Sequence, residues 1–263
     1  MVACRVVDPE AFDPPELAAL VGAVPWVVDV ICRHEVDSTN AEALRLASAG
    51  APAGTIVVAD TQTAGRGRRG RAWWSEPGTA LLAPSLLRPG LDPERLPLLS
   101  LLAGVAAARA ASAAGGIAVR LKWPNDLVVD ERKLGGILSE SDGQGAVVVG
   151  LGLNVRQTEF PDDLAASATS IVGAGGRTPS RAWVLAATLS SFGARMAAPE
   201  EVLDDYRAMC VTLGRSVRVE LSFGDAAEGK AIDITTSGAL IVEGASGSRV
   251  VPSGDVVHLR PNP

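Results

Sequence analysis

The chain has 263 residues, 47% of them hydrophobic, and a formal net charge of −6. This length supports one large domain with a full core and a smaller second one, and the acidic total argues against a general binder of nucleic acid or membrane surfaces. With two histidines and three well separated cysteines, the chain has few residues from which to build a metal centre or a Ser-His-Asp triad. The few, scattered cysteines are typical of a protein from a reducing compartment.

The first 24 residues contain one short helical stretch, Glu16 to Val21, which is too small for a folded module. We therefore expect no DNA-binding domain ahead of the core. No basic-then-apolar signal pattern opens the chain, and the most apolar run, Leu96 to Gly116, is interrupted by polar residues. The expected location is the cytoplasm, without a membrane span.

The core is expected to begin with a strand, Trp26 to Glu35, and a helix, Ala41 to Ser48. The segment DSTN between them supplies residues that commonly cap a helix N-terminus. Capping accounts for one of these side chains, whereas the other hydroxyl and amide groups are placed to hold a ligand beside the helix N-terminus. Both interpretations stay open for this segment.

A strand from Thr55 to Asp60 leads into Gln62 and then into GRGRRGRAWW, Gly65 to Trp74, which we call the arginine loop. Four arginines fall within six residues, and the glycines among them remove helix propensity and let backbone N–H groups approach a ligand. Guanidinium groups bind carboxylate and phosphate through paired hydrogen bonds. The loop therefore predicts an anion site at a strand end, where ligands of α/β sheets sit.

Three other interpretations of the arginine loop are weaker. Its letters match G-x-G-x-x-G, but the dinucleotide fingerprint must open a helix, and Pro77 and Gly78 follow here. RNA-binding Arg-Gly segments repeat in disordered tails, whereas this segment occurs once between strand-like runs. A flexible basic loop without a ligand stays open from the loop alone.

The chain after the loop returns to regular structure. Thr79 to Leu87 reads as a strand, and Pro84 predicts that it lies at an edge or a bulge because proline removes one ladder hydrogen bond. Leu96 to Ala114 is expected to be a buried core helix, with no need for a cofactor role.

A second dense stretch, Val119 to Glu140, has the pattern of a hairpin whose arms carry Lys122 and Lys133. Its polar corner, Asn125-Asp126, is a good turn, but it also presents an amide and a carboxylate at a strand end.

Glycines open space in the strands that follow this corner. Gly135 and Gly136 lie beside Lys133, and Gly150 and Gly152 lie within the next strand, Ala146 to Val155. Such glycines let a ligand or another backbone come close. We expect these strands and the arginine loop to converge on one glycine-lined, cation-rich cavity.

Two helices, Pro179 to Met196 and Pro199 to Leu213, are expected to close the main domain, the first with Trp183 among its apolar positions. From Gly214 onward, short strands alternate with Gly, Ser and Asp turns, which predicts a small β-barrel of about 50 residues. The sequence thus predicts an α+β protein with domains at residues 1–212 and 213–263.

Four motifs, DSTN, GRGRRGR with Trp73, KWPNDLVVDERKLGGIL and GLGLNV, resemble in this order the motifs of biotin protein ligases, over nearly the whole chain. The resemblance implies a catalytic domain like that of class II aminoacyl-tRNA synthetases, with a mixed sheet flanked by helices, and a C-terminal SH3-like β-barrel. It also implies the monofunctional type, without an N-terminal DNA-binding domain.

The reaction that the resemblance implies has two halves. Biotin and ATP with Mg²⁺ give biotinyl-5′-AMP and pyrophosphate, and biotin then passes to a specific lysine. That lysine would lie in the biotin carboxyl carrier domain of an acetyl-CoA, acyl-CoA or pyruvate carboxylase. No DNA or membrane partner is expected.

The resemblance also implies residue roles, by match to the motifs. Biotin would be bound by Ser38, Thr39, Gln62, Gly65, Arg66, Lys133, Gly136, Leu138, Gly150 and Gly152. ATP and the adenylate would be bound by Arg68, Arg71, Trp73, Lys122, Asn125, Lys133 and Asn154. The catalytic residues would be Lys133, bridging the biotin carboxylate and the α-phosphate; Arg68, limiting escape of the adenylate; and Asp126, either holding Mg²⁺ or orienting the acceptor amine.

Three residues, Trp74, Ala80 and Pro84, differ from those commoner at these positions, which puts ordering of the loop and sheet-mediated dimerisation in doubt. A monomer or a weak homodimer is therefore expected.

Two alternative functions stay open. A lipoate ligase or lipoyl transferase shares the fold, but its arginine-serine-glycine loop is absent. A biotin-sensing regulator needs a DNA-reading helix and a basic face.

Overall fold

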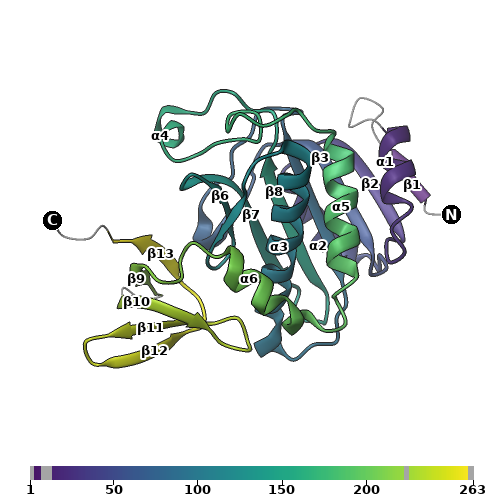
Figure 1. Ribbon diagram of the computed structural model, residues 1–263. Helices are drawn as coiled ribbons and strands as arrows, with labels where there is room; N and C mark the ends of the chain where they lie inside the picture. The colour runs from purple at the N-terminus through teal and green to yellow at the C-terminus, as the bar shows by residue number, and fades with distance from the viewer. Residues whose placement is uncertain (1–2, 7–13, 222–224, 260–263) are drawn as a thin grey trace.

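The computed structural model describes residues 3–6, 14–221 and 225–259 of the chain. They form an eight-stranded mixed sheet flanked by helices and a separate five-stranded antiparallel sheet (Figure 1). This architecture confirms the predicted α+β class. The outermost ends of the two predicted domains, residues 1–2 and 260–263, lie outside the described residues.

The first sheet has the strand order β1-β2-β3-β4-β8-β7-β6-β5. β1, β2 and β3 are parallel to one another, and every other neighbouring pair is antiparallel. The strands are β1 Ala3–Val6, β2 Asp29–Val36, β3 Thr55–Gln62, β4 Ala80–Leu87, β5 Arg120–Lys122, β6 Asp126–Val129, β7 Arg132–Ser141 and β8 Val147–Asn154.

Helices cover the two faces of this sheet unequally. The helices are α1 Pro14–Val21, α2 Thr39–Ser48, α3 Leu96–Gly115, α4 Asp162–Ala165, α5 Arg181–Gly193 and α6 Leu203–Met209, with short 3₁₀ turns η1 Arg68–Gly70, η2 Pro93–Arg95 and η3 Pro199–Val202. In Figure 1, α3 and α5 lie in front of the sheet and α2 lies behind it.

Residues of β3 alternate between the two faces, as the side-chain period of a strand requires. Ile56 and Val58 belong to the large core with α1, α3 and α5, whereas Val57 belongs to a small core with α2. Helix α2 packs mainly against β3, β4 and β8, and its Asn40 side chain also hydrogen-bonds to β7.

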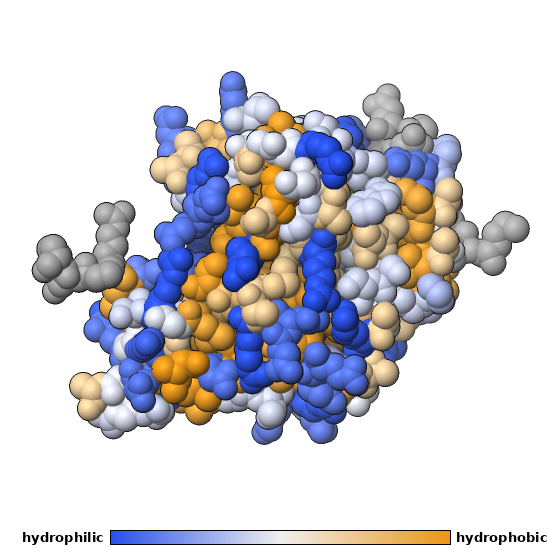
Figure 2. Space-filling model, in the orientation of Figure 1, coloured by the Kyte–Doolittle hydropathy of each residue, from blue (hydrophilic) through white to orange (hydrophobic). Residues whose placement is uncertain are grey.

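Helix α3 is the central core helix, as predicted, and most of its residues are buried. It ends at Gly116, whose φ of 71° is the left-handed conformation that glycine adopts most readily. By length and composition Pro93–Gly115 could cross a membrane, but 67% of its apolar window is buried inside the protein. The face shown in Figure 2 mixes hydrophilic and apolar residues, which fits a helix layer packed on a sheet.

The second sheet has the order β12-β11-β10-β9-β13, with β9 Ser216–Glu220, β10 Ala226–Ile234, β11 Leu240–Gly244, β12 Gly247–Val251 and β13 Asp255–His258. It is antiparallel throughout, in agreement with the predicted small β domain. Trp123, 2% exposed, joins the two parts, because its indole N–H donates to the carbonyl of Gly238 at 3.0 Å.

Two sequence expectations need correction. Of the two alternatives given for the strand with Pro84, the edge is wrong: β4 lies between β3 and β8 and pairs with β8 along its whole length. Its ladder to β3 pairs only at Ser85 and Leu82, so the interruption around Pro84 tolerates a residue without an N–H group. Trp183, expected at an apolar position of its helix, is 42% exposed.

Candidate active site

The arginine loop folds as a tight hairpin between β3 and β4. Backbone hydrogen bonds close it from Gly67 N to Arg71 O at 2.7 Å and from Trp73 N to Gly65 O at 2.9 Å. At its tip Arg69 and the glycine after it take φ values of 55° and 74°, so the chain reverses sharply and spreads the guanidinium groups. The loop opens no α-helix, which agrees with the rejection of a dinucleotide fingerprint.

Three arginines of the loop contact the second sheet. Asp255 at the start of β13 pairs with Arg71 at 2.9 Å, and Arg68 and Arg69 each lie 3.7 Å from the same carboxylate. Arg68 also donates to the carbonyl of Gly254 at 3.1 Å and to the side-chain oxygen of Asn125 at 3.3 Å. Burial lowers the pKa of Arg68, and the nearby charge of Asp255 opposes this shift. Sequence reasoning missed Asp255.

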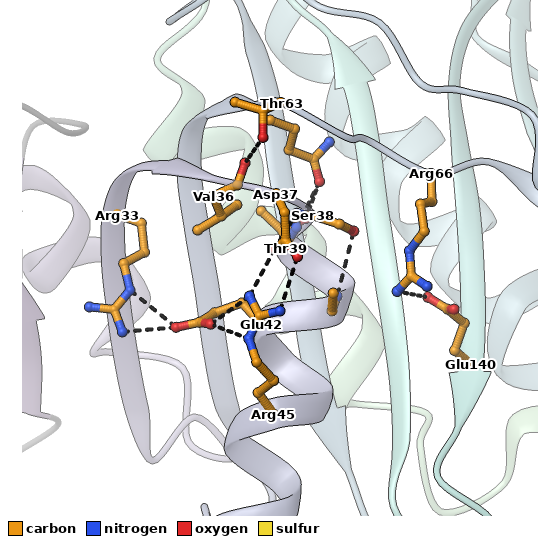
Figure 3. A network of polar contacts seen from close by, with 12 residues as sticks. Arg33, Val36, Asp37, Ser38, Thr39, Glu42, Arg45, Thr63, Arg66 and Glu140 are labelled. Carbon is orange, nitrogen blue, oxygen red and sulfur yellow. Dashed lines mark hydrogen bonds and ion pairs between the residues drawn. The ribbon is translucent and has the colours of Figure 1, made fainter.

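The segment before α2 is preorganised by hydrogen bonds. Ser38 is the N-cap of α2, which confirms the capping interpretation for this residue. Thr39 instead donates from its backbone N and its hydroxyl to Gln62 Oε1, at 2.8 and 2.9 Å. These two hydrogen bonds fix the orientation of the Gln62 side-chain amide. Figure 3 shows this segment beside the ion pairs that hold α2, among them Asp37 with Arg45.

Three of the predicted glycines are required by close contacts. A Cβ at Gly150 would lie 2.0 Å from Asn40 Oδ1, and one at Gly152 would lie 3.0 Å from the Trp73 ring. A Cβ at Gly65 would lie 2.6 Å from the Trp73 carbonyl. Distances of 3.0 Å or less demand a shift of one partner, so these residues are glycines because side chains or backbone of the site occupy the space.

Lys133 lies at the centre of the site. Its ammonium nitrogen is 2.6 Å from Asp126 Oδ1 and 5.9 Å from the centroid of the Trp73 ring. A Cβ at Gly136 would lie 3.5 Å from the same nitrogen. The Lys133 backbone is fixed as well, since its N–H donates to Ser167 O at 2.7 Å and its carbonyl accepts from Thr169 N at 2.8 Å.

Lys122 is a half-buried cation near this centre. Burial lowers its pKa, and the nearby positive charge of Lys133 lowers it further against the opposing effect of Asp126. Within the described part of the chain no carboxylate lies within ion-pair distance of Lys122. A half-buried cation without a paired carboxylate favours the binding of an anion beside it.

One cavity of about 270 Å³ joins most of these residues. Of the residues singled out from sequence it is lined by Ser38, Thr39, Gln62, Arg66, Arg68, Arg71, Trp73, Asn125, Lys133, Gly136, Leu138, Gly150, Gly152 and Asn154. Gly65, Lys122 and Asp126 do not line it. Gly65 lines a second cavity of about 830 Å³, which shares the arginine loop with the first, and Asp126 contacts the first cavity's lining at Lys133 and Gly136.

Sequence reasoning missed the cover of this cavity, which comes from the chain after β8. Phe160, Leu164, Ser167 and Ala168 line it, and the Phe160 ring lies 6.1 Å from that of Trp74. These residues have no periodic pattern that would mark them. Backbone hydrogen bonds join Ser167 to Lys133, and Ser167 and Ala168 to the Leu164 carbonyl.

Two buried polar atoms at the cavity have no hydrogen-bond partner among the described residues. They are the indole nitrogen of Trp73 and Oδ1 of Asn154, whose side-chain nitrogen donates to the Thr169 carbonyl at 3.0 Å. One is a donor and the other an acceptor. Buried polar groups are rarely left unpaired, so both indicate a polar ligand.

Family models and known proteins were compared with the chain. Residues 31–154 match the biotin/lipoate A/B protein ligase family, and residues 212–259 match the biotin protein ligase C terminal domain. The chain is similar to biotin–[acetyl-CoA-carboxylase] ligase of Mycobacterium tuberculosis, with 39% identity over 89% of each chain. It is 36% identical to the bifunctional ligase/repressor BirA of Bacillus spizizenii, over 86% of this chain and 73% of that one.

Solved structures agree with these matches. A biotin protein ligase from Aquifex aeolicus, in complex with biotin and ATP, aligns with a TM-score of 0.78 at 30% identity. The alignment covers 88% of this chain and 98% of that one.

Proposed function

The chain belongs to the biotin protein ligase family, and we propose that the site formed by its 270 Å³ cavity and the adjoining arginine loop binds biotin and ATP side by side. The enzyme joins the two substrates as biotinyl-5′-AMP and releases pyrophosphate. It then transfers biotin to a protein lysine. The acceptor that we propose is the biotin carboxyl carrier domain of a carboxylase.

The position of Lys133 is the observation that carries this assignment. Its ammonium group lies 3.5 Å from the place of a Cβ at Gly136 and 5.9 Å from the centroid of the Trp73 ring, and all three residues line the cavity. A cation at the junction of two subsites is suited to two anions that must meet there. We call the two subsites the vitamin end, Ser38, Thr39, Asn40, Gln62 and Gly150, and the phosphate end, Arg68, Arg71, Lys122 and Asp255.

The first half-reaction brings two anions together. A carboxylate oxygen of biotin attacks the α-phosphorus of ATP, the bond to the bridging oxygen breaks, and pyrophosphate leaves. Lys133 would neutralise the carboxylate and the α-phosphate as the bond forms, while Arg68 and Arg71 hold phosphate oxygens. Asp126 keeps Lys133 in place at 2.6 Å before the substrates arrive.

The second half-reaction needs a neutral amine. The acceptor lysine nitrogen attacks the carbonyl carbon of the mixed anhydride, AMP leaves, and the nitrogen loses a proton. The cover with Phe160 and Leu164 would keep water from the anhydride until then. Trp73 and Asn154 would meet the adenine with their unpaired donor and acceptor.

Magnesium fits this site as part of the ATP substrate. The described residues include no group of three or more His, Cys, Asp or Glu side chains that could hold a metal ion. Mg²⁺ commonly binds through one or two carboxylates together with substrate phosphates. Asp126 is the residue that would supply a carboxylate, or alternatively would orient the acceptor amine.

Exchange of radiolabelled pyrophosphate into ATP tests the assignment directly. We expect label in ATP when biotin is supplied, and none when lipoate or octanoate replaces it. Label only with lipoate would replace this proposal with a lipoate ligase. Mass spectrometry of a carboxyl carrier domain incubated with the enzyme should show one biotinylated lysine. We further propose that the enzyme acts in the cytoplasm as a monomer or weak homodimer, which sedimentation at several concentrations would check.

A further inference from the structure

Glu140 on β7 connects the vitamin end with the arginine loop through one carboxylate oxygen. Its Oε2 accepts from the Asn40 side-chain nitrogen at 2.8 Å and from an Arg66 guanidinium nitrogen at 3.3 Å. In Figure 3 the Arg66 and Glu140 side chains point toward each other from separate segments. Neither motif comparison nor spacing singled out Glu140.

Asn40 forms the floor of the vitamin end. It is 5% exposed, and its amide lies against the backbone of Gly150, where an added Cβ would be 2.0 Å away. Its nitrogen also donates to the Leu138 carbonyl at 3.0 Å. Glu140 supplies the second acceptor, so two acceptors on β7 hold the amide nitrogen. Asn40 lines the cavity, whereas Glu140 does not.

Arg66 depends on Glu140 more than the other loop arginines do. Its side chain is 44% exposed, and Glu140 is the sole ion-pair or hydrogen-bond partner recorded for it within residues 3–6, 14–221 and 225–259. Arg68, Arg69 and Arg71 are instead held by the second sheet. Glu140 therefore holds the beginning of the arginine loop, at Arg66, next to the vitamin end.

We propose that Glu140 is a positioning residue for biotin binding: it fixes Asn40 and Arg66 together, so that the floor of the vitamin end and the beginning of the arginine loop are in place at once. The inference rests on the proposed function, because it concerns the biotin subsite of that cavity. An ordinary surface ion pair would contribute little and would not couple to ligand affinity.

Biotin affinity, measured by calorimetry without ATP, tests this role. Glu140→Ala should weaken biotin binding about tenfold, because a charge-assisted contact is lost and the Asn40 amide keeps only one of its two acceptors. The KM for ATP in the exchange assay should change less than twofold, since the phosphate end keeps its contacts. Glu228→Ala, which removes a carboxylate paired with Arg218 on the second sheet, is the matched control and should leave both values unchanged.

A double-variant cycle separates positioning from general support of the fold. If Glu140 acts through Arg66, the variant Glu140→Ala/Arg66→Ala should bind biotin little more weakly than Glu140→Ala alone. Additive losses, or equal losses for biotin and ATP, would mean a merely structural role and overturn the proposal. Glu140→Gln keeps an acceptor for Asn40 and loses the ion pair, so an intermediate affinity is expected.

Two results keep this test apart from that of the function. A wild-type enzyme that shows biotin-dependent exchange, with unchanged biotin affinity in both Glu140 variants, would refute the positioning role and leave the function intact. A wild-type enzyme without biotin-dependent exchange would refute both. If Glu140→Ala does not fold, the biotin affinities of Glu140→Gln and Arg66→Ala are compared instead, and unchanged affinity in both would refute the positioning role.

Discussion

At the vitamin end, Thr39 already donates two hydrogen bonds to the side-chain oxygen of Gln62, and Asn40 already lies against Gly150. At the phosphate end, the arginines that would receive phosphate are occupied by a carboxylate from another sheet, Asp255. The first subsite can accept a neutral, shape-matched ligand with little change. In the proposed function, the second exchanges one anion for another, so we expect phosphate binding there to change contacts between the two parts of the molecule.

The comparison explains why the two ends use different residue types. Biotin's ring system is uncharged, and a fixed pattern of donors and acceptors recognises it best when it is preorganised. Triphosphate carries several charges, and clustered arginines without a counter-ion would repel one another. Asp255 lowers that repulsion while no nucleotide is bound. Lys133, between the two ends, has Asp126 in the same role.

The largest effect is expected from Lys133→Ala, which removes the cation between the two ends. Adenylate formation should fall about a thousandfold, because no charge would neutralise the meeting anions, while biotin should still bind. Pyrophosphate exchange and calorimetry measure the two properties separately. Lys230→Ala, on the exposed side of β10, is the control. Near-normal exchange in Lys133→Ala would remove this residue from the centre of the mechanism.

Gly150→Ala should damage the vitamin end alone. The new Cβ would be 2.0 Å from Asn40 Oδ1, and relieving such an overlap costs about 1–3 kcal/mol of folding free energy. Biotin binding should weaken at least as strongly, with little change in the KM for ATP. In Gly104→Ala, on α3, the added Cβ would meet only Leu121 at 3.5 Å, so chemical denaturation should find no comparable loss. Equal stability of both variants would mean that Asn40 moves aside freely.

Asp255→Asn should loosen the phosphate end. Each ion pair contributes about 0–1 kcal/mol because it is partly exposed, so trypsin should cut the arginine loop a few times faster in the ligand-free protein. Biotin with ATP should restore protection, since phosphate replaces the lost carboxylate. Asp225→Asn, which breaks a pair with Arg249 on the second sheet, is the control. Unchanged cleavage in Asp255→Asn would show that backbone contacts alone hold the loop.

The smallest effect concerns acid stability. Burial, with Lys122 and Arg215 nearby, lowers the pKa of His258 from 6.5 to about 4. Between these values the unfolded chain binds a proton that the folded chain does not, so stability falls as the pH drops from 6.5 toward 4. Asp37, near the vitamin end, has a pKa of about 2, lowered mainly by its hydrogen bond to Arg45, and loses its contribution only at lower pH.

Thermal melting of His258→Gln between pH 7 and 4.5 checks this assignment. The variant should show a shallower decrease in melting temperature than the wild type, whereas His34→Gln, at an exposed position, should follow the wild type. Parallel curves for His258→Gln and the wild type would place the acid-sensitive group elsewhere.

Local signals made much of the fold and site predictable. The strands and helices were marked by periodicity and by turn residues, and the arginine loop and the glycines stood out by composition. Asp255 and Glu140 had no such signal, because their partners are distant in sequence: Arg71 and Asp255 are 184 residues apart. Pro84 led to the wrong expectation of an edge strand. A proline excludes an interior position only where the strand pairs completely with both neighbours, and β4 pairs incompletely with β3.

The backbone ladder between Lys133 and the segment Ser167 to Thr169 has a consequence for altering this enzyme. It fixes the backbone of Lys133, the lysine that we propose to be central to the reaction, to a segment beyond the exposed stretch near Glu159. We therefore expect a foreign peptide grafted at Glu159 to alter the cover of the cavity more than the position of Lys133.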